Sequence, residues 1–314
     1  MSIILNMISI KNIITLSKHT DLTESLALSH DEQVLMSAGR DGNLLCWDTI
    51  SHDIIHSWCP YNGFELYHAD MSGNSRFALA CFGQYKEIHV IDMTTKQSFF
   101  VPLLEHCTFP LFGVDNSIIS FTKNLVYKID ITGHNGINFI FRADSRINTF
   151  QISRSRKNII ISTRKNTIHL LDALSGFPRA VIPKKYSKIA FISVSDDDSW
   201  LVIGDKQANC IDVWRLCMDK SQVLLTLVAS HSSVHKWCEN IFECEYFNLV
   251  SQDNAYVCGT LTPLIYIDFT HQKAQVIDKE IGYVASIAIN KNMKKIYIPL
   301  TSESLGTLGI VSYT

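Results

Sequence analysis

Four side chains near the start of the sequence have the types and spacing to form a chain of hydrogen bonds. They are His19, Ser37, Asp41 and Trp47. An indole N–H can donate to a hydroxyl, a hydroxyl to an imidazole, and an imidazole N–H to a carboxylate. The same residue types could also provide a His–Asp catalytic pair. Because buried polar groups need partners, we favour the structural chain and expect no catalytic residue among them.

A second group has the spacing of metal ligands. His231, His235, Cys238 and Cys244 lie within one stretch of 14 residues. His and Cys are the usual zinc ligands, and a loop could fold four of them into a tetrahedral site. The competing interpretation places His231 in a loop equivalent to that of His19 and Cys244 in a strand, as a small buried core residue. We favour this second interpretation and expect neither a metal nor a cofactor.

Three short strands would position the first group. Apolar residues alternate in three runs, at Leu26 and Leu28, at Val34 and Met36, and at Leu45 and Trp47. Residues 40–42, Arg-Asp-Gly, predict a tight turn between the second and third runs. The pattern therefore indicates three antiparallel strands.

The same pattern repeats along the rest of the chain. The third run of each unit ends at Asp48, Asp92, Asp130, Asp172, Arg215, Asp268 and Ser312. The mean spacing is about 44 residues, which is typical of repeat proteins with four strands per unit. Seven endings predict seven units, with six or eight as alternatives.

Residues 19–48, HTDLTESLALSHDEQVLMSAGRDGNLLCWD, resemble one WD40 repeat. The resemblance implies an all-β fold, a seven-bladed β-propeller of four-stranded antiparallel blades, in a single domain of residues 1–314. It also implies that His19, Ser37, Asp41 and Trp47 are a structural tetrad that fixes the loops of one blade.

The last expected strand, which ends at Ser312, needs an outer partner. Residues 12–16 precede His19 much as residues 224–227 precede His231. We therefore expect an N-terminal outer strand that closes the ring and removes exposed sheet edges. Residues 1–10 form an apolar leader, and its residues 3–8 are a second candidate contact, with packing along the outer strand as the alternative.

Composition indicates the compartment. The 314 residues are 46% apolar but contain no uninterrupted apolar run of the roughly 18 residues that a membrane helix needs. The apolar N-terminus lacks a basic leader and a small-residue cleavage site, so we expect no signal peptide. Nine cysteines, an odd number, and no Asn-x-Ser/Thr sequon favour a reducing compartment. We expect the cytoplasm, with the nucleus as the alternative.

Enzyme motifs are missing from the sequence. It contains no GxGxxG, GxxxxGK[ST], GxSxG, HExxH or CxxC. We therefore expect a protein that is not an enzyme. The alternative is a propeller hydrolase with a metal in the central channel, where ligands would come from the innermost strands. The polar candidates there are Glu65, Asp70, Asn148, Glu243 and Glu245.

Basic residues are concentrated in one part of the chain. The stretch from Arg142 to Lys188 has eleven Lys and Arg against two acidic residues, in a chain whose net charge is −2. On a propeller, one subset would lie on loops of a single face around blades 4 and 5. These candidate partner-binding residues are Arg142, Arg146, Arg164, Lys165, Lys184, Lys185 and Lys188. We expect Arg154, Arg156 and Lys157 on the opposite face.

Such a basic face has several interpretations. It can be simple solvated surface, or it can bind an acidic protein, RNA or an anionic lipid. The lipid alternative rests on similarity to the phosphoinositide-binding propellers of autophagy, but residues 182–186, IPKKY, lack the arginine pair and glycine of their Phe-Arg-Arg-Gly motif. We expect a non-catalytic scaffold with protein partners in a stable complex, and RNA as an alternative ligand. We expect neither a membrane nor a small-molecule substrate.

Overall fold

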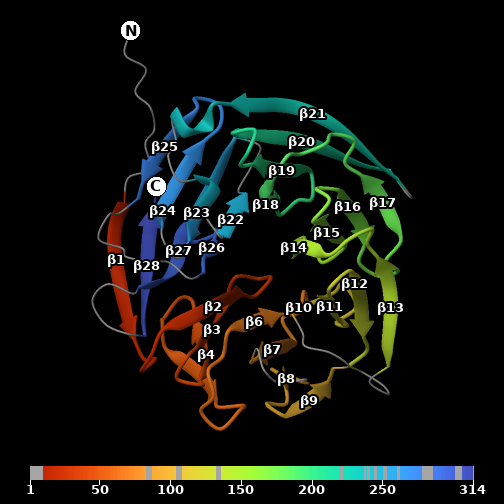
Figure 1. The fold of residues 1–314 in the computed structure, drawn as a ribbon. Coiled ribbons are helices and arrows are strands. Elements are labelled where there is room, and N and C mark those ends of the chain that lie inside the picture. The colour runs from red at the N-terminus through yellow and green to blue at the C-terminus, as the bar shows by residue number, and fades with distance from the viewer. Residues whose placement is uncertain are drawn as a thin grey trace.

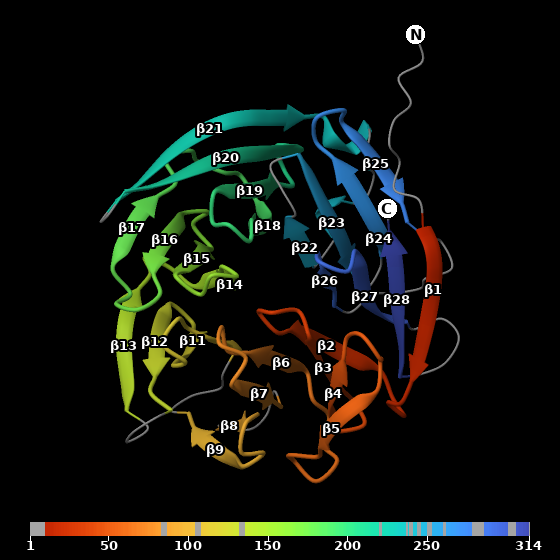
Figure 2. The same cartoon turned by 180° about the vertical axis from the view of Figure 1, so that it is seen from behind.

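The expected seven-bladed β-propeller is confirmed. In this computed structural model, seven four-stranded antiparallel sheets surround a central channel (Figure 1). The ring is equally complete when seen from behind (Figure 2). The structure describes residues 10–82, 87–103, 108–131, 136–219, 222–236, 238, 241–243, 246–249, 253–259, 262–277, 286–300 and 306–313.

The strands follow one another from the channel outward within each blade. Blade 1 consists of β2 (Thr23–Leu28), β3 (Val34–Gly39), β4 (Leu44–Asp48) and β5 (Ile54–Trp58). Blade 2 consists of β6 (His68–Met71), β7 (Phe77–Cys81), β8 (Glu87–Asp92) and β9 (Ser98–Pro102). Blade 3 consists of β10 (Thr108–Phe112), β11 (Ile118–Thr122), β12 (Leu125–Ile129) and β13 (Ile137–Arg142). Blade 4 consists of β14 (Ile147–Ile152), β15 (Asn158–Thr163), β16 (Ile168–Asp172) and β17 (Pro178–Val181).

The remaining blades have the same strand order, but blade 5 has two longer outer strands and blade 7 takes its outer strand from the N-terminal part of the chain. Blade 5 consists of β18 (Ile189–Val194), β19 (Trp200–Asp205) and the long pair β20 (Cys210–Asp219) and β21 (Gln222–Ser232). Two short 3₁₀ helices, η1 (Val234–Lys236) and η2 (Ile241–Glu243), lead to blade 6. Blade 6 consists of β22 (Tyr246–Leu249), β23 (Asn254–Gly259), β24 (Thr262–Asp268) and β25 (Lys273–Val276). Blade 7 consists of β26 (Ala288–Asn290), β27 (Lys295–Leu300), β28 (Thr307–Tyr313) and β1 (Ile10–Ser17).

Strand β1 closes the ring from the other end of the chain. It pairs antiparallel with β28, so that Ile13 lies opposite Val311 and Leu16 opposite Leu308. Figure 1 shows the two strands side by side, red against blue. The expected outer strand at residues 12–16 lies within β1. The free edge that β28 would otherwise expose is thereby covered.

The hydrophobic core is divided among the blade interfaces. Seven clusters of buried side chains each join two neighbouring blades. At the closure, Trp47 of blade 1 and Tyr297 of blade 7 belong to one such cluster. The seam between the two ends of the chain is therefore packed like the other interfaces, which favours a rigid ring. Within the described residues, no helix is both long and apolar enough to cross a membrane.

Candidate functional site

The structure brings the four tetrad side chains together in blade 1. The Trp47 indole donates to Ser37 Oγ over 2.8 Å, and Ser37 Oγ lies 2.8 Å from His19 Nε2. His19 Nδ1 lies 3.0 Å from Asp41 Oδ1. Because an indole can only donate and a carboxylate only accept, the Ser37 proton points to His19 Nε2 and Nδ1 donates to Asp41. The result is one continuous chain that links the turn before β4 to the loop after β1.

Close packing explains a glycine beside the tetrad. A Cβ on Gly39 would lie 2.5 Å from His19 Nδ1 and 2.7 Å from Asp41 Oδ1, so a larger residue would displace this pair. Burial acts to raise the pKa of Asp41, but hydrogen bonds from His19 and the Thr20 amide outweigh it and hold the pKa well below its usual value. Asp41 is thus a fixed, ionised acceptor.

Blade 5 has a second polar network that the sequence analysis missed. Trp214 Nε1 donates to the Tyr186 hydroxyl, and that hydroxyl donates to Asp212 Oδ2, both over 2.9 Å. Lys184 Nζ lies 2.6 Å from the same oxygen, and Ser230 donates to Asp212 Oδ1 over 2.6 Å. The Asp212 side chain has no exposed surface. The network therefore neutralises a fully buried carboxylate.

This network corresponds in part to the tetrad of blade 1. Trp214 lies on β20, the third strand of its blade, as Trp47 does on β4. Its hydroxyl partner, however, comes from the loop before β18 rather than from the second strand. Burial raises the pKa of Tyr186 well above its usual value, and the Asp212 carboxylate adds to the shift, so the hydroxyl stays protonated and can donate. Trp214, in the segment VWR, was the one residue of this network whose position in the repeat could have indicated it from the sequence.

Hydrogen bonds join the loops that carry the predicted basic face. The Arg164 amide donates to the Arg146 carbonyl over 2.8 Å, which connects the loop after β15 to the loop before β14. Asn166 Nδ2 donates to the Ser187 carbonyl over 2.9 Å, which connects the same loop to the one before β18. The three loops therefore form one continuous surface.

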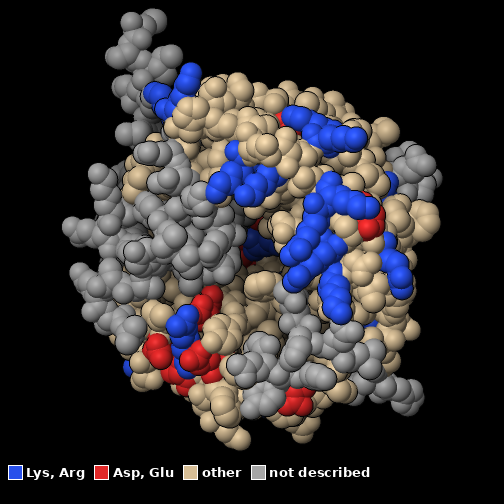
Figure 3. Space-filling model, in the orientation of Figure 1, with Lys and Arg blue, Asp and Glu red and all other residues tan. Residues whose placement is uncertain are grey.

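Five of the predicted residues form an unpaired basic cluster on this surface, which we call the basic ridge. Its members are Arg146, Arg164, Lys165, Lys185 and Lys188. All five are exposed, and none has an ion pair with another residue in the described part of the chain. Figure 3 shows Lys and Arg gathered over the side of the ring formed by β14–β18, whereas acidic side chains on this face lie mainly near β2–β4.

The other two predicted residues have local partners. Lys184 is half-buried and belongs to the Asp212 network, so its charge is already neutralised by a buried carboxylate. Arg142 is also exposed, but it ends β13, outside the three hydrogen-bonded loops, and its guanidinium lies 5.9 Å from the centre of the Phe139 ring. The ridge is therefore narrower than the sequence predicted.

The opposite end of blade 4 has basic residues with a different role. Arg154, Arg156 and Lys157 lie on the turn between β14 and β15, at the other end of these strands from the turn that carries Arg164. Arg154 lies 2.7 Å from Glu32 Oε1 in blade 1 and 3.1 Å from Asp196 Oδ2 in blade 5. Its charge is thus neutralised inside the ring.

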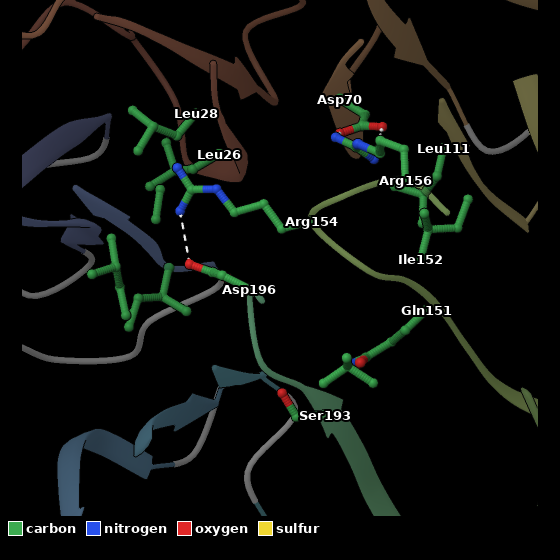
Figure 4. Close-up of a pocket in the computed structure, with 14 residues that line it drawn as sticks. Leu26, Leu28, Asp70, Leu111, Gln151, Ile152, Arg154, Arg156, Ser193 and Asp196 are labelled. Atoms are coloured by element: carbon green, nitrogen blue, oxygen red, sulfur yellow. Dashed lines mark hydrogen bonds and ion pairs between the residues drawn. The ribbon is translucent and has the colours of Figure 1, made fainter. Parts of the chain in front are cut away.

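Arg156 also pairs along the channel wall. Its Nη2 lies 2.7 Å from Asp70 Oδ1, and its Nη1 lies 2.8 Å from Oδ2. Figure 4 shows this pair beside a cavity of about 320 Å³, with Arg154 extending toward Leu26 and Leu28. The cavity thus combines apolar walls with ion pairs that are already satisfied.

Among the described residues, the other channel candidates form no metal-holding group with Asp70. Glu65 was predicted on an innermost strand, but it lies in the loop before β6, which begins at His68. Glu243 was also predicted there, but it lies in η2 because blade 6 begins only at Tyr246. Both predicted positions were wrong, because the strands start later than the apolar pattern suggested. Asn148 lies on β14 with an exposed side chain, and Glu245 is outside the described residues.

The possible zinc ligands form no metal site among the described residues. His231 lies within β21, not in the expected loop, and its ring stacks on Phe269 with centroids 5.7 Å apart. His235 lies in η1 and bonds to Asn209, and Cys238 is buried. Cys244 lies outside the described residues. In the part of the chain that the structure describes, no group of three His, Cys, Asp or Glu could hold a metal ion.

Two further predicted contacts have separate outcomes. Residues 3–8 of the apolar leader lie outside the described residues. In residues 182–186, the segment compared with a lipid-binding motif, Ile182 and Tyr186 are buried and Lys184 is paired. Only Lys185 contributes an exposed, unpaired cation.

Comparison with known proteins supports the fold. No protein-family model and no curated protein matches the sequence. Among solved structures, the β-propeller domain of Cps50 (Swd1) from Myceliophteria thermophila is similar, with a TM-score of 0.72 and 12% identity. The match covers 98% of this chain and 100% of that domain. At this identity the likeness shows the propeller fold alone.

Proposed function

We propose that this protein is a non-catalytic scaffold, a divergent propeller of the WD40 type, whose basic ridge binds an acidic surface of a protein partner in a stable complex. The observation that carries the proposal is the ridge: five exposed cations on hydrogen-bonded neighbouring loops, unpaired within the described chain. Like charges held on adjacent loops repel one another, and an acidic partner would relieve that repulsion. The same field would accelerate encounter with such a partner.

The composition of the loops favours protein over RNA. Recognition of single-stranded RNA usually stacks bases on exposed aromatic rings. Residues 143–147, 163–167 and 183–188 include one aromatic side chain, Tyr186, and it is buried in the Asp212 network. The ridge therefore offers charge without a stacking platform, which suits carboxylates on a folded partner.

Charge reversal with a matched control tests the proposal. The ridge variant carries Arg164→Glu, Lys165→Glu and Lys188→Glu. The control variant changes net charge by the same amount at Lys96→Glu, Lys157→Glu and Lys273→Glu. All three lysines are exposed and lie at the opposite face, in the β8–β9 loop, in the β14–β15 turn and at the start of β25. Both variants should melt within about 2 °C of the intact protein, because exposed charges contribute little to stability.

Quantitative co-purification of tagged protein from its own cells then compares the three forms. We expect the ridge variant to lose one protein partner that the intact protein and the control variant retain. Retention of every partner by the ridge variant would contradict the proposal. Release of that partner by nuclease treatment of the intact complex would instead identify RNA as the ligand.

A further inference from the structure

A second surface lies on the loop that joins blade 1 to blade 2. Phe64 is 52% exposed and Tyr67 is 41% exposed. Both rings pack against Phe82, with ring centroids 5.7 and 6.1 Å apart. We call these three rings the aromatic patch. Exposed rings in contact with one another are uncommon on a surface that binds nothing.

The backbone beneath the patch is anchored to both blades. The Leu66 amide donates to the Gly39 carbonyl over 3.0 Å. The side chain of Leu66, which lies between Phe64 and Tyr67 in the sequence, is fully buried. The Tyr67 amide reaches the Cys81 carbonyl over 3.3 Å. The loop backbone that carries the rings is therefore fixed to both blades before any ligand arrives, which lowers the entropy cost of binding.

Carboxylates give the patch a negative rim. The Tyr67 hydroxyl donates to Glu65, and Glu24 pairs with Arg40 beside it. Among the described residues, these two carboxylates face one cation, Arg40. On the face shown in Figure 3, acidic side chains near β2–β4 lie on the opposite side of the channel from the basic side chains over β14–β18.

We propose that the aromatic patch binds an arginine-bearing segment of a protein partner. A planar guanidinium can stack on an exposed ring face, where the ring quadrupole attracts it, while its aliphatic stem covers apolar ring surface. The free oxygen of Glu65 would then accept from the guanidinium. An acidic segment or an anionic lipid would be repelled by the same carboxylates, so this surface and the basic ridge select opposite charges.

The test measures binding of a defined probe to the full-length protein. The probe is a fluorescent octapeptide of alternating Arg and Ser, and the readout is fluorescence anisotropy at physiological salt. The patch variant carries Phe64→Ser and Tyr67→Ser, and a second variant carries Glu65→Gln. The control, Phe177→Ser, removes a ring that is 67% exposed on the turn between β16 and β17, on the opposite face.

We expect the patch variant to raise Kd about fivefold or more, and Glu65→Gln to raise it about two- to threefold. Phe177→Ser should leave Kd unchanged. All variants should melt like the intact protein, because the altered rings are exposed and Glu65→Gln keeps an acceptor for the Tyr67 hydroxyl. The ridge variant should bind this probe at least as well as the intact protein, so failure of the ridge proposal would not affect this result.

Two results would overturn the inference. One is equal binding of the arginine peptide, or no binding of it, by the intact protein and the patch variant. The other is sedimentation of the intact protein as a dimer that the patch variant converts to a monomer, since a second copy of the chain would then cover the rings.

Discussion

The guanidinium of Arg156 lies 2.7 Å from a carboxylate oxygen of Asp70, although the two residues belong to blades 4 and 2. The amide of Phe112, on the innermost strand of blade 3, donates to the other oxygen over 2.8 Å. Three consecutive blades are thus joined at the channel wall by one buried carboxylate. We expect this contact to stabilise the ring rather than to bind a ligand.

Removal of Arg156 should be costly because it leaves a buried charge unpaired. Arg156→Met should lower the free energy of unfolding by roughly 3–5 kcal/mol, and the double variant with Asp70→Asn should recover part of that loss. Arg76→Met, which breaks a more exposed pair with Asp92, should cost only about 0–1 kcal/mol. Urea unfolding followed by circular dichroism measures all three. Equal losses for Arg156→Met and Arg76→Met would count against a structural role of the buried pair.

The tetrad of blade 1 should also behave as a stability element. Ser37→Ala removes the hydroxyl between Trp47 and His19, and we expect a loss of about 1–3 kcal/mol from the two orphaned groups. Trp47→Ala should cost roughly 3–5 kcal/mol through cavity formation. The exposed Ser57 on β5 provides the control, since Ser57→Ala should be neutral. Normal unfolding of Ser37→Ala combined with lost partner binding would reveal a functional role instead.

Two adjacent lysines should have separable effects. Lys184→Met breaks the contact with the buried Asp212 carboxylate, so it should lower the free energy of unfolding by roughly 1–3 kcal/mol. Lys185→Met should leave unfolding unchanged, because this side chain is exposed and unpaired within the described residues, yet it should weaken partner binding. Thermal melts and binding assays on the two variants distinguish the roles. If Lys184→Met also left unfolding unchanged and weakened partner binding, Lys184 would belong to the binding surface instead.

His89 should make stability depend on pH. Burial lowers the pKa of this side chain, which is 4% exposed, from 6.5 to about 4. The contribution of neutral His89 to the free energy of unfolding is fully present above pH 6.5 and is lost as the pH falls toward 4. The reason is that the unfolded chain takes up a proton that the folded chain excludes. Between pH 7 and pH 5 the free energy of unfolding should fall by about 2 kcal/mol through this side chain.

The variant His89→Gln removes that titration. Its unfolding free energy, measured in urea at both pH values, should therefore fall less than that of the intact protein over the same interval. An identical fall in the two proteins would show that His89 is not responsible.

Local patterns predicted the ring but not the contacts between distant residues. The period of the strand endings gave the seven blades, and the tetrad was readable because its four members lie within one repeat. Asp70 and Arg156 are 86 positions apart, and no periodicity links them. Tyr186 was hidden because it supplies from a loop the hydroxyl that Ser37 supplies from a strand. The charge run correctly located the loops of the ridge, but sequence alone did not reveal that Lys184 turns inward to Asp212.

Binding of a defined acidic probe tests the central claim most directly. The probe is a fluorescent octapeptide of alternating Asp and Ser, titrated with the intact protein, the ridge variant and the opposite-face control over a range of NaCl concentrations. We expect the intact protein and the control to bind with an affinity that weakens as salt rises. The Kd of the ridge variant for this peptide should be at least about tenfold higher than that of the intact protein. Equal binding of the peptide by the ridge variant and the control would contradict the account.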